Sequence, residues 1–165
     1  MEKSLKVLNR DQIKYLAIIL MTFNHIAHIL MTSGTAVYEV FEDIGYFTSI
    51  TMCYFFVEGY FYTHSRRNYA KRLFIFALIS EIPFDLATRG NILNFEYQNV
   101  FFTLLIGFLA MCALDMAKKK FEDEDKRTLY GSYVVIAIVA CVAAHFLKTD
   151  YSAFGVFAII IMYYF

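Results

Sequence analysis

The sequence predicts an all-α protein that crosses a membrane with about six helices. Of its 165 residues, 59% are hydrophobic and 19% aromatic, with one proline, and the mean hydropathy is +0.51. This composition is too apolar for an ordinary soluble domain of this size. The charged residues cluster in short segments between long apolar runs. We therefore expect one transmembrane domain over residues 1–165, in contact with the lipid bilayer and without a basic surface for nucleic acid.

Six apolar runs follow one another along the chain, and each is a candidate membrane helix. They cover residues 14–32, 44–63, 73–87, 100–117, 129–147, and the chain from 151 onward. The first run has no signal-peptide cleavage site, so we interpret it as a retained helix. The last run contains 15 residues, and this length of helix, about 22 Å, is shorter than a hydrocarbon core of about 30 Å. Either this helix is tilted into a cavity or the sequence is a shortened form of a longer helical bundle, and we favour the shortened form.

Counts of lysine and arginine predict the orientation of these helices. Three basic residues precede the first run, and the five connecting segments then carry none, four, one, five and one. Cytoplasmic loops are enriched in lysine and arginine. The alternation therefore places the N-terminus in the cytoplasm and segments 33–43 and 88–99 outside.

The first run carries two histidines in a segment otherwise suited to lipid, and ionisable groups inside a membrane helix usually mark a site. Lys14 and His25 are eleven residues apart, so they lie within about 20° of each other around the helix. Asp11 lies about 40° from this stripe, and His28 extends it. A carboxylate, an ammonium group and an imidazole therefore line up from the membrane surface inward. The alternative is that the histidines only pack helices together, as polar residues in membranes often do.

Three acidic residues lie inside the second and third runs, at depths comparable to that of His25. Glu58 belongs to the second run, whereas Glu81 and Asp85 are four residues apart in the third and share one helix face. Such carboxylates can orient a catalytic base or form a proton relay. The alternative for Glu81 and Asp85 is that each pairs with a lysine or caps a broken helix.

Metal or disulfide chemistry has little support in the sequence. It contains four histidines, with a single His-x-x-His pair, and three isolated cysteines inside apolar runs. We therefore expect no metal centre and no disulfide framework. One metal ion held by His25, His28 and carboxylates remains an alternative.

Four stretches resemble the TraX family, whose name comes from the F-pilin acetylase of conjugative plasmids. They are DQIKYLAIILMTFNHIAHIL, FFVEGYFYTHSRRNYAKRLFIFALISEIPFDL, NVFFTLLIG and DYSAFGV, and the resemblance covers nearly the whole chain. TraX-like proteins in turn resemble integral-membrane acyltransferases that modify surface sugars, whose first helix carries Asp-x-x-Arg-x10-His. Asp11, Lys14 and His25 occupy these places. Lysine keeps the charge of the arginine but loses the planar fork that holds a phosphate with two bonds.

The resemblance implies a multi-pass enzyme of the bacterial cytoplasmic membrane that transfers an acetyl or other short acyl group from acetyl-CoA. His25 would be its general base, oriented by Glu58 or Glu81. Basic residues on the cytoplasmic side would neutralise the phosphates of coenzyme A: Lys14, Arg66, Arg67 and Arg72. The positive-inside rule alone also explains most of these charges. The acceptor would be a pilin or other peptide N-terminus, a surface glycan or a lipid headgroup.

Two other classes of protein remain open. A small proton-coupled transporter would use Glu58, Glu81, Asp85 and His25 as a relay and would bind its solute without acyl-CoA. A membrane-embedded scaffold would use the same residues only to hold its helices together. Such a scaffold would tolerate His25→Ala with little loss of function.

Overall fold

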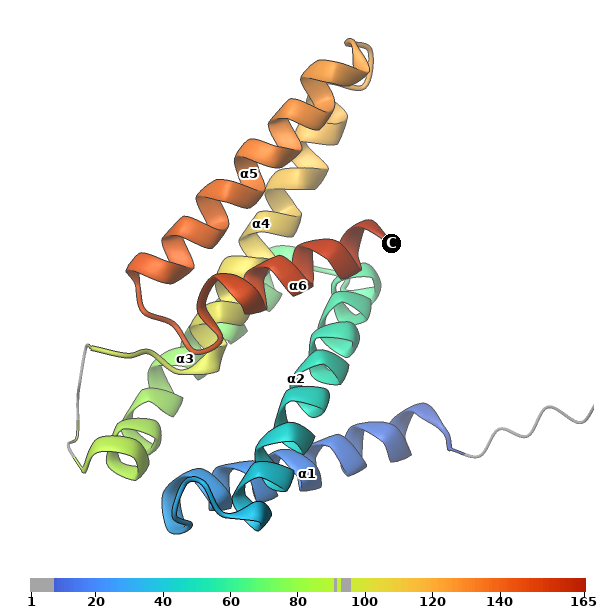
Figure 1. The fold of residues 1–165 in the computed structure, drawn as a ribbon. Coiled ribbons are helices and arrows are strands. Elements are labelled where there is room, and N and C mark those ends of the chain that lie inside the picture. Colours follow the sequence, from blue (N-terminus) through green and yellow to red (C-terminus); the bar gives the residue numbers. More distant parts are fainter. Residues whose placement is uncertain (1–7, 91, 93–95) are drawn as a thin grey trace, which may run out of the picture. The chain divides into compact units, whose positions relative to one another are not determined.

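The computed structural model describes residues 8–90, 92 and 96–165, and these residues form six helices (Figure 1). The helices are α1 (Arg10–Leu30), α2 (Ala36–Tyr62), α3 (Arg66–Arg89), α4 (Val100–Lys120), α5 (Lys126–Phe146) and α6 (Ser152–Tyr164). Each predicted apolar run lies largely within one of them, so the all-helical prediction is confirmed for the described chain. Helices α2 and α3 begin eight and seven residues before the predicted starts at 44 and 73, so they include parts of the predicted connecting segments. Lys3, Lys6 and part of the predicted outer segment 88–99 lie outside the described residues.

Three of the helices, α1, α4 and α5, are long and apolar enough to cross a membrane. Each has 21 residues, and a helix of that length measures about 31 Å, which matches a hydrocarbon core of about 30 Å. Large apolar side chains are exposed along all three, including Ile18, Leu109 and Val135. A lipid environment accounts for apolar exposure on this scale. The chain is therefore a membrane protein.

The chain divides within α2 into two compact units, Met1–Phe55 and Phe56–Phe165, and each is described by itself. In the first unit α1 packs against the first part of α2 around the buried Asn24. The side-chain amide of Asn24 donates a hydrogen bond to the carbonyl of Phe41 at 3.2 Å. Gly45 lies so close that an added Cβ would overlap the Asn24 side chain. Asn24, which is buried and lies off the stripe of Lys14 and His25, therefore joins this helix pair.

Gly45→Ala is expected to destabilise the protein by about 1–2 kcal/mol, because the new methyl group overpacks the contact with Asn24. Asn24→Ala in the same chain removes the obstructing side chain and should restore much of the loss. Thermal unfolding in detergent measures both effects. Gly131→Ala is the control, since a Cβ at this helical glycine would meet no described atom within 4 Å apart from its chain neighbours and its own helix backbone. Additive destabilisation by the two substitutions would contradict the contact.

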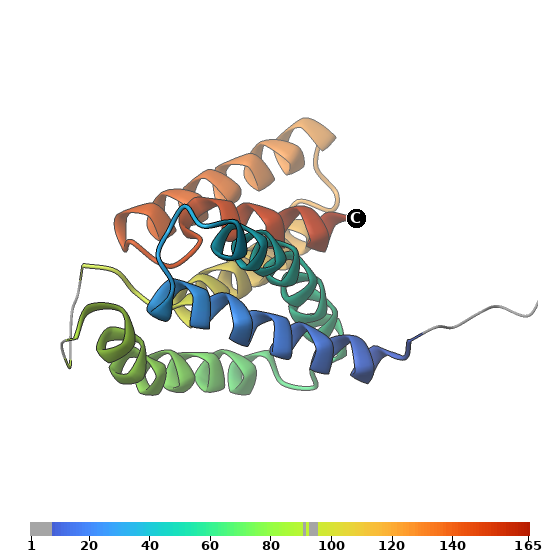
Figure 2. The ribbon, with the colours of Figure 1, turned by 60° about the horizontal axis from the view of Figure 1, so that its bottom comes forward.

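The second unit is organised around α4, which packs against α3, α5 and α6. Figure 1 shows α4 and α5 side by side along their length, with α6 crossing α4. Two glycines allow this crossing: a Cβ on Gly107 would lie 2.6 Å from Ile159, and a Cβ on Gly155 would lie 2.8 Å from Thr103. Pro83 lies inside helix α3, which runs from Arg66 to Arg89. Figure 2 shows the six helices from another side.

The DYSAFGV stretch forms the junction between the loop before α4 and the start of α6. Asp150 donates its backbone N–H to the carbonyl of Gln98 at 2.8 Å and accepts a hydrogen bond from the Tyr97 hydroxyl at 2.9 Å. Burial, followed by the charge of Asp150, raises the pKa of Tyr97, so this hydroxyl keeps its proton and remains a donor. Tyr151 adopts the left-handed conformation at φ 57°. Asp150 and Gly155 of this stretch therefore have a structural role.

The packing brings the basic segments of the second unit together at one end. This basic end contains the start of α3, the end of α4 and the start of α5, with residues 66–72, 118–120 and 126–127. The DYSAFGV junction lies at the opposite ends of α4 and α6. Within the second unit, the segments rich in lysine and arginine thus lie at one end, and the DYSAFGV junction, which has few basic residues, lies at the other.

Candidate functional site

Asp115, five residues before the end of α4, gathers side chains from three other helices. The Arg66 guanidinium of α3 lies 2.5 Å from Oδ2 of Asp115, and the Tyr60 hydroxyl of α2 donates to the same oxygen at 2.7 Å. The Tyr163 hydroxyl of α6 donates to Oδ1. Only 21% of the Asp115 side chain is exposed. We call these four residues the aspartate cluster.

The aromatic rings of the aspartate cluster reinforce its hydrogen bonds. Tyr60 is 1% exposed, and the Arg66 guanidinium lies over its ring at 4.5 Å from the centroid. This is the geometry of a cation–π interaction. The Tyr60 ring also packs edge to face against Tyr163 at 5.7 Å and against Phe108 at 5.2 Å. The cluster thus fixes the relative positions of the end of α2, the start of α3, and α4 and α6.

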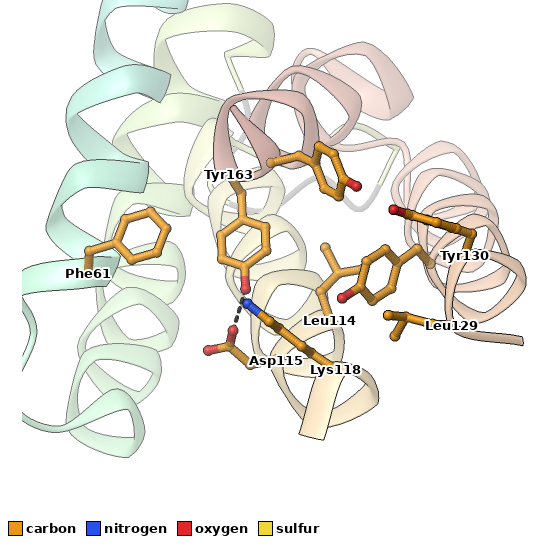
Figure 3. A pocket seen from close by; sticks show the side chains of 9 residues that line it. Phe61, Leu114, Asp115, Lys118, Leu129, Tyr130 and Tyr163 are labelled. Atoms are coloured by element: carbon orange, nitrogen blue, oxygen red, sulfur yellow. Dashed lines mark hydrogen bonds between the residues drawn. The ribbon is translucent and has the colours of Figure 1, made fainter. Parts of the chain in front are cut away.

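A pocket of about 530 Å³ opens beside the cluster at the basic end (Figure 3). Ligand sites in proteins typically have volumes of about 300–1,000 Å³. We call it the tyrosine pocket, and it is lined by Phe61, Leu114, Asp115, Lys118, Leu129, Tyr130, Tyr133, Tyr163 and Tyr164. These residues come from α2, α4, α5 and α6, so the pocket depends on the packing of the whole second unit.

The charges around the tyrosine pocket favour an anionic ligand. Arg66 neutralises the carboxylate of Asp115. Lys118 lines the pocket and makes no hydrogen bond or ion pair within residues 8–90, 92 and 96–165. When Arg66, which pairs with Asp115 from outside the lining, is counted, the charge of Lys118 is left uncompensated.

Glu81 and Asp85 are both buried on α3, as their shared helix face predicts, and Asp85 is 0% exposed. Oε2 of Glu81 accepts hydrogen bonds from the backbone N–H of Asn99, at 3.3 Å, and from the Asn99 side-chain amide. That amide also donates to the Ala77 carbonyl at 2.8 Å, while the Asn99 side-chain oxygen caps the start of α4. Glu81 therefore joins α3 to α4. Its other oxygen, Oε1, accepts no hydrogen bond from the described residues.

The residues predicted on the first run lie on α1, in the first unit. His25 is exposed and makes no hydrogen bond or ion pair in the part of the chain that the structure describes. The ammonium group of Lys14 lies over the Phe55 ring, 5.1 Å from its centroid. His28 pairs through Nδ1 with the Tyr38 hydroxyl at 3.0 Å. Asp11 is exposed in the first turn of the helix.

The predicted catalytic residues are divided between the two units. His25 belongs to the first, whereas Glu58, which is half-buried on α2, and Glu81 belong to the second. The pairing of His25 with one of these carboxylates therefore stays a prediction. Of the arginines predicted to bind the donor, Arg66 pairs with Asp115, and Arg67 and Arg72 are exposed on the first turns of α3.

Sequence reasoning missed Asp115, Lys118 and the tyrosines of the pocket. Tyrosines are common where membrane helices meet water, so their pattern in a membrane sequence does not indicate a site. One signal was available, because Asp115 is the only acidic residue in the apolar run 100–117. A carboxylate in such a run needs a partner.

Fold and site together define a helical membrane protein with a charged, tyrosine-lined pocket at its basic end. Residues 9–165 match the family model described as TraX protein. The match covers nearly the whole chain, so the protein belongs to the TraX family, and the resemblance drawn from the sequence is confirmed.

One relative among known proteins is described as "Probable fimbrial assembly protein FimC, serogroup H1", from Dichelobacter nodosus. It is 34% identical over 107 residues, which cover 61% of this chain and 44% of the relative. The match thus spans less than half the length of that protein. No solved structure matches the chain.

Proposed function

We propose that the protein is an integral-membrane acyltransferase that moves an acetyl or other short acyl group from acetyl-CoA to an acceptor of the cell envelope. Membership of the TraX family and a relative described as a fimbrial assembly protein support an acceptor related to pili or fimbriae. The proposed acceptor is the N-terminus of a pilin or of another peptide. A surface glycan and a lipid headgroup are the alternatives. The observation that carries the proposal is the ligand-sized pocket with Lys118 at the basic end. The proposed topology assigns this end to the cytoplasm, where the donor is made.

In the proposed reaction His25 takes the proton from the amine or hydroxyl of the acceptor as its nitrogen or oxygen attacks the thioester carbonyl. The tetrahedral intermediate collapses with cleavage of the carbon–sulfur bond, and the proton passes to the departing thiolate of coenzyme A. Glu58 or Glu81 would orient the imidazole. Lys14, on the same stripe of α1, would offset the negative charge of the donor.

The same proposal includes a topology of about six spans in the bacterial cytoplasmic membrane, with the N-terminus and the basic end in the cytoplasm. The distribution of lysine and arginine supports it. The meeting of residues 66–72, 118–120 and 126–127 at one end of the second unit supports it as well.

Cysteine labelling tests this topology in a chain whose three native cysteines are replaced by alanine. Ser33→Cys and Lys148→Cys should react with an impermeant maleimide in intact cells, because both positions are exposed on the predicted outer side. Lys119→Cys, at the basic end, should react only after the cells are permeabilised. The reverse pattern would overturn the orientation.

Acyl transfer itself is tested with the purified chain in proteoliposomes that receive acetyl-CoA labelled in the acetyl group. In parallel, mass spectrometry of envelope peptides and glycans from cells with and without the gene should find an acceptor that gains one acetyl group. Transfer of the labelled acetyl group from coenzyme A to an acceptor would support the enzyme. Proton-driven solute uptake without any acyl transfer would favour the transporter instead.

A further inference from the structure

We propose that the tyrosine pocket binds an adenine nucleotide, and specifically the 3′-phosphorylated ADP end of coenzyme A. The choice of coenzyme A rests on the proposed function. Nucleotide binding by the pocket is argued from its own lining and can be measured without any acyl transfer.

The walls of the pocket suit a flat aromatic ligand. Among the tyrosine rings of the lining, the Tyr133 ring lies near two others, with centroids 6.3 Å from Tyr130 and 6.2 Å from Tyr164. Both pairs meet edge to face, at interplanar angles of 85° and 78°. The Tyr133 ring therefore stacks on neither neighbour, so a nucleobase can stack on it.

The charge of the lining selects a phosphate over a cation. Aromatic cages also bind ammonium groups through the faces of their rings, but the ammonium group of Lys118 in this lining would repel a cation. Here Asp115 is already paired with Arg66 and accepts hydrogen bonds from two tyrosine hydroxyls. Lys118 has no partner among the described residues, and an ammonium group is a common ligand for phosphate.

This arrangement gives different tasks to two basic residues of the basic end. Arg66 acts on the pocket through Asp115, which it holds together with the tyrosines of α2 and α6. Lys118 faces the pocket and supplies the charge that meets the phosphate. Arg66 is thus a positioning residue, and Lys118 is the binding residue.

Calorimetric titration tests the inference on the full chain in nanodiscs of zwitterionic phosphatidylcholine, with adenosine 3′,5′-bisphosphate as the probe. We expect saturable binding that Lys118→Gln weakens by about tenfold, because a charge-assisted hydrogen bond to phosphate is lost. Tyr133→Ala should weaken it by about tenfold through lost stacking, and Lys118→Arg should retain it. Lys119→Gln is the matched control, since Lys119 is the next residue of α4 and does not line the pocket. Circular dichroism and gel filtration confirm that each variant is folded.

Several results would overturn the inference. These are absence of binding to the wild-type chain, equal weakening by Lys119→Gln, and equal affinity for inorganic pyrophosphate, which has no ring to stack. Displacement of the probe when phosphatidylglycerol replaces phosphatidylcholine would assign the anion site to a lipid headgroup instead.

The same variants separate this inference from the proposed function. Nucleotide binding without acyl transfer would contradict the acyltransferase and leave the pocket assignment standing. Acyl transfer by Lys118→Gln with an unchanged KM for acetyl-CoA would support the acyltransferase and contradict the assignment of the pocket.

Discussion

His25→Ala is expected to lower acyl transfer from acetyl-CoA by about 10² to 10⁴-fold, the loss typical of removing a general base. His25→Gln should be as inactive, because its amide can form hydrogen bonds but cannot accept the proton. The side chain is exposed on α1 and makes no hydrogen bond or ion pair within the described chain. Its replacement should therefore leave the packing of α1 against α2 at Asn24 intact, so a lost activity reports on chemistry.

The measurement compares these variants with the wild type in proteoliposomes at matched protein levels, using labelled acetyl-CoA. His28→Ala is the control on the same helix, about 60° away around its axis and engaged with the Tyr38 hydroxyl at 3.0 Å. It should cost much less activity. Near-normal transfer by His25→Gln would show that His25 is not the general base, and Glu58 and Glu81 would then be the candidates.

Asp115→Ala should lower the free energy of unfolding by about 2–3 kcal/mol. The substitution breaks an ion pair and two interhelical hydrogen bonds at once and leaves Arg66 without its carboxylate. The effect should fall below that of a fully buried pair, because the Arg66 side chain is 45% exposed. Denaturant unfolding in mixed micelles, followed by tyrosine fluorescence or circular dichroism, measures the change.

Asp125→Ala provides the matched control, since Asp125 is exposed before α5 and its side chain makes no capping hydrogen bond. It should change stability little. Because Asp115 and Arg66 act on each other, the double variant Asp115→Ala with Arg66→Met should lose less than the sum of the two single losses. Strict additivity would mean that the two side chains do not interact as the structure shows.

The helices were predictable from the sequence because a chain in lipid must satisfy its backbone hydrogen bonds within each segment. Long apolar runs therefore become helices wherever they occur, and all six runs did so. The alignment of Lys14 and His25 on one helix face could also be predicted, because residues eleven apart share a face whatever the helix packs against. Basic segments on alternate connections could be counted directly.

The sequence by itself thus determined the class of protein, the six helices and the stripe on α1, all of which follow from local periodicity and composition. Only the tertiary structure decided which polar residues join helices: Asn24 with Phe41 and Gly45, and Glu81 with Asn99. It also decided that Asp150 and Gly155 hold α6 against α4.

The aspartate cluster and the tyrosine pocket could not be read from the sequence for a physical reason. Asp115 lies 55 residues from Tyr60 and 48 residues from Tyr163 along the chain. No helical or strand period relates positions so far apart, so their contact depends on how four helices pack. The glycines at 107 and 155 permit that packing, and only the folded chain shows that they bring a carboxylate, two tyrosine hydroxyls and an arginine to one point.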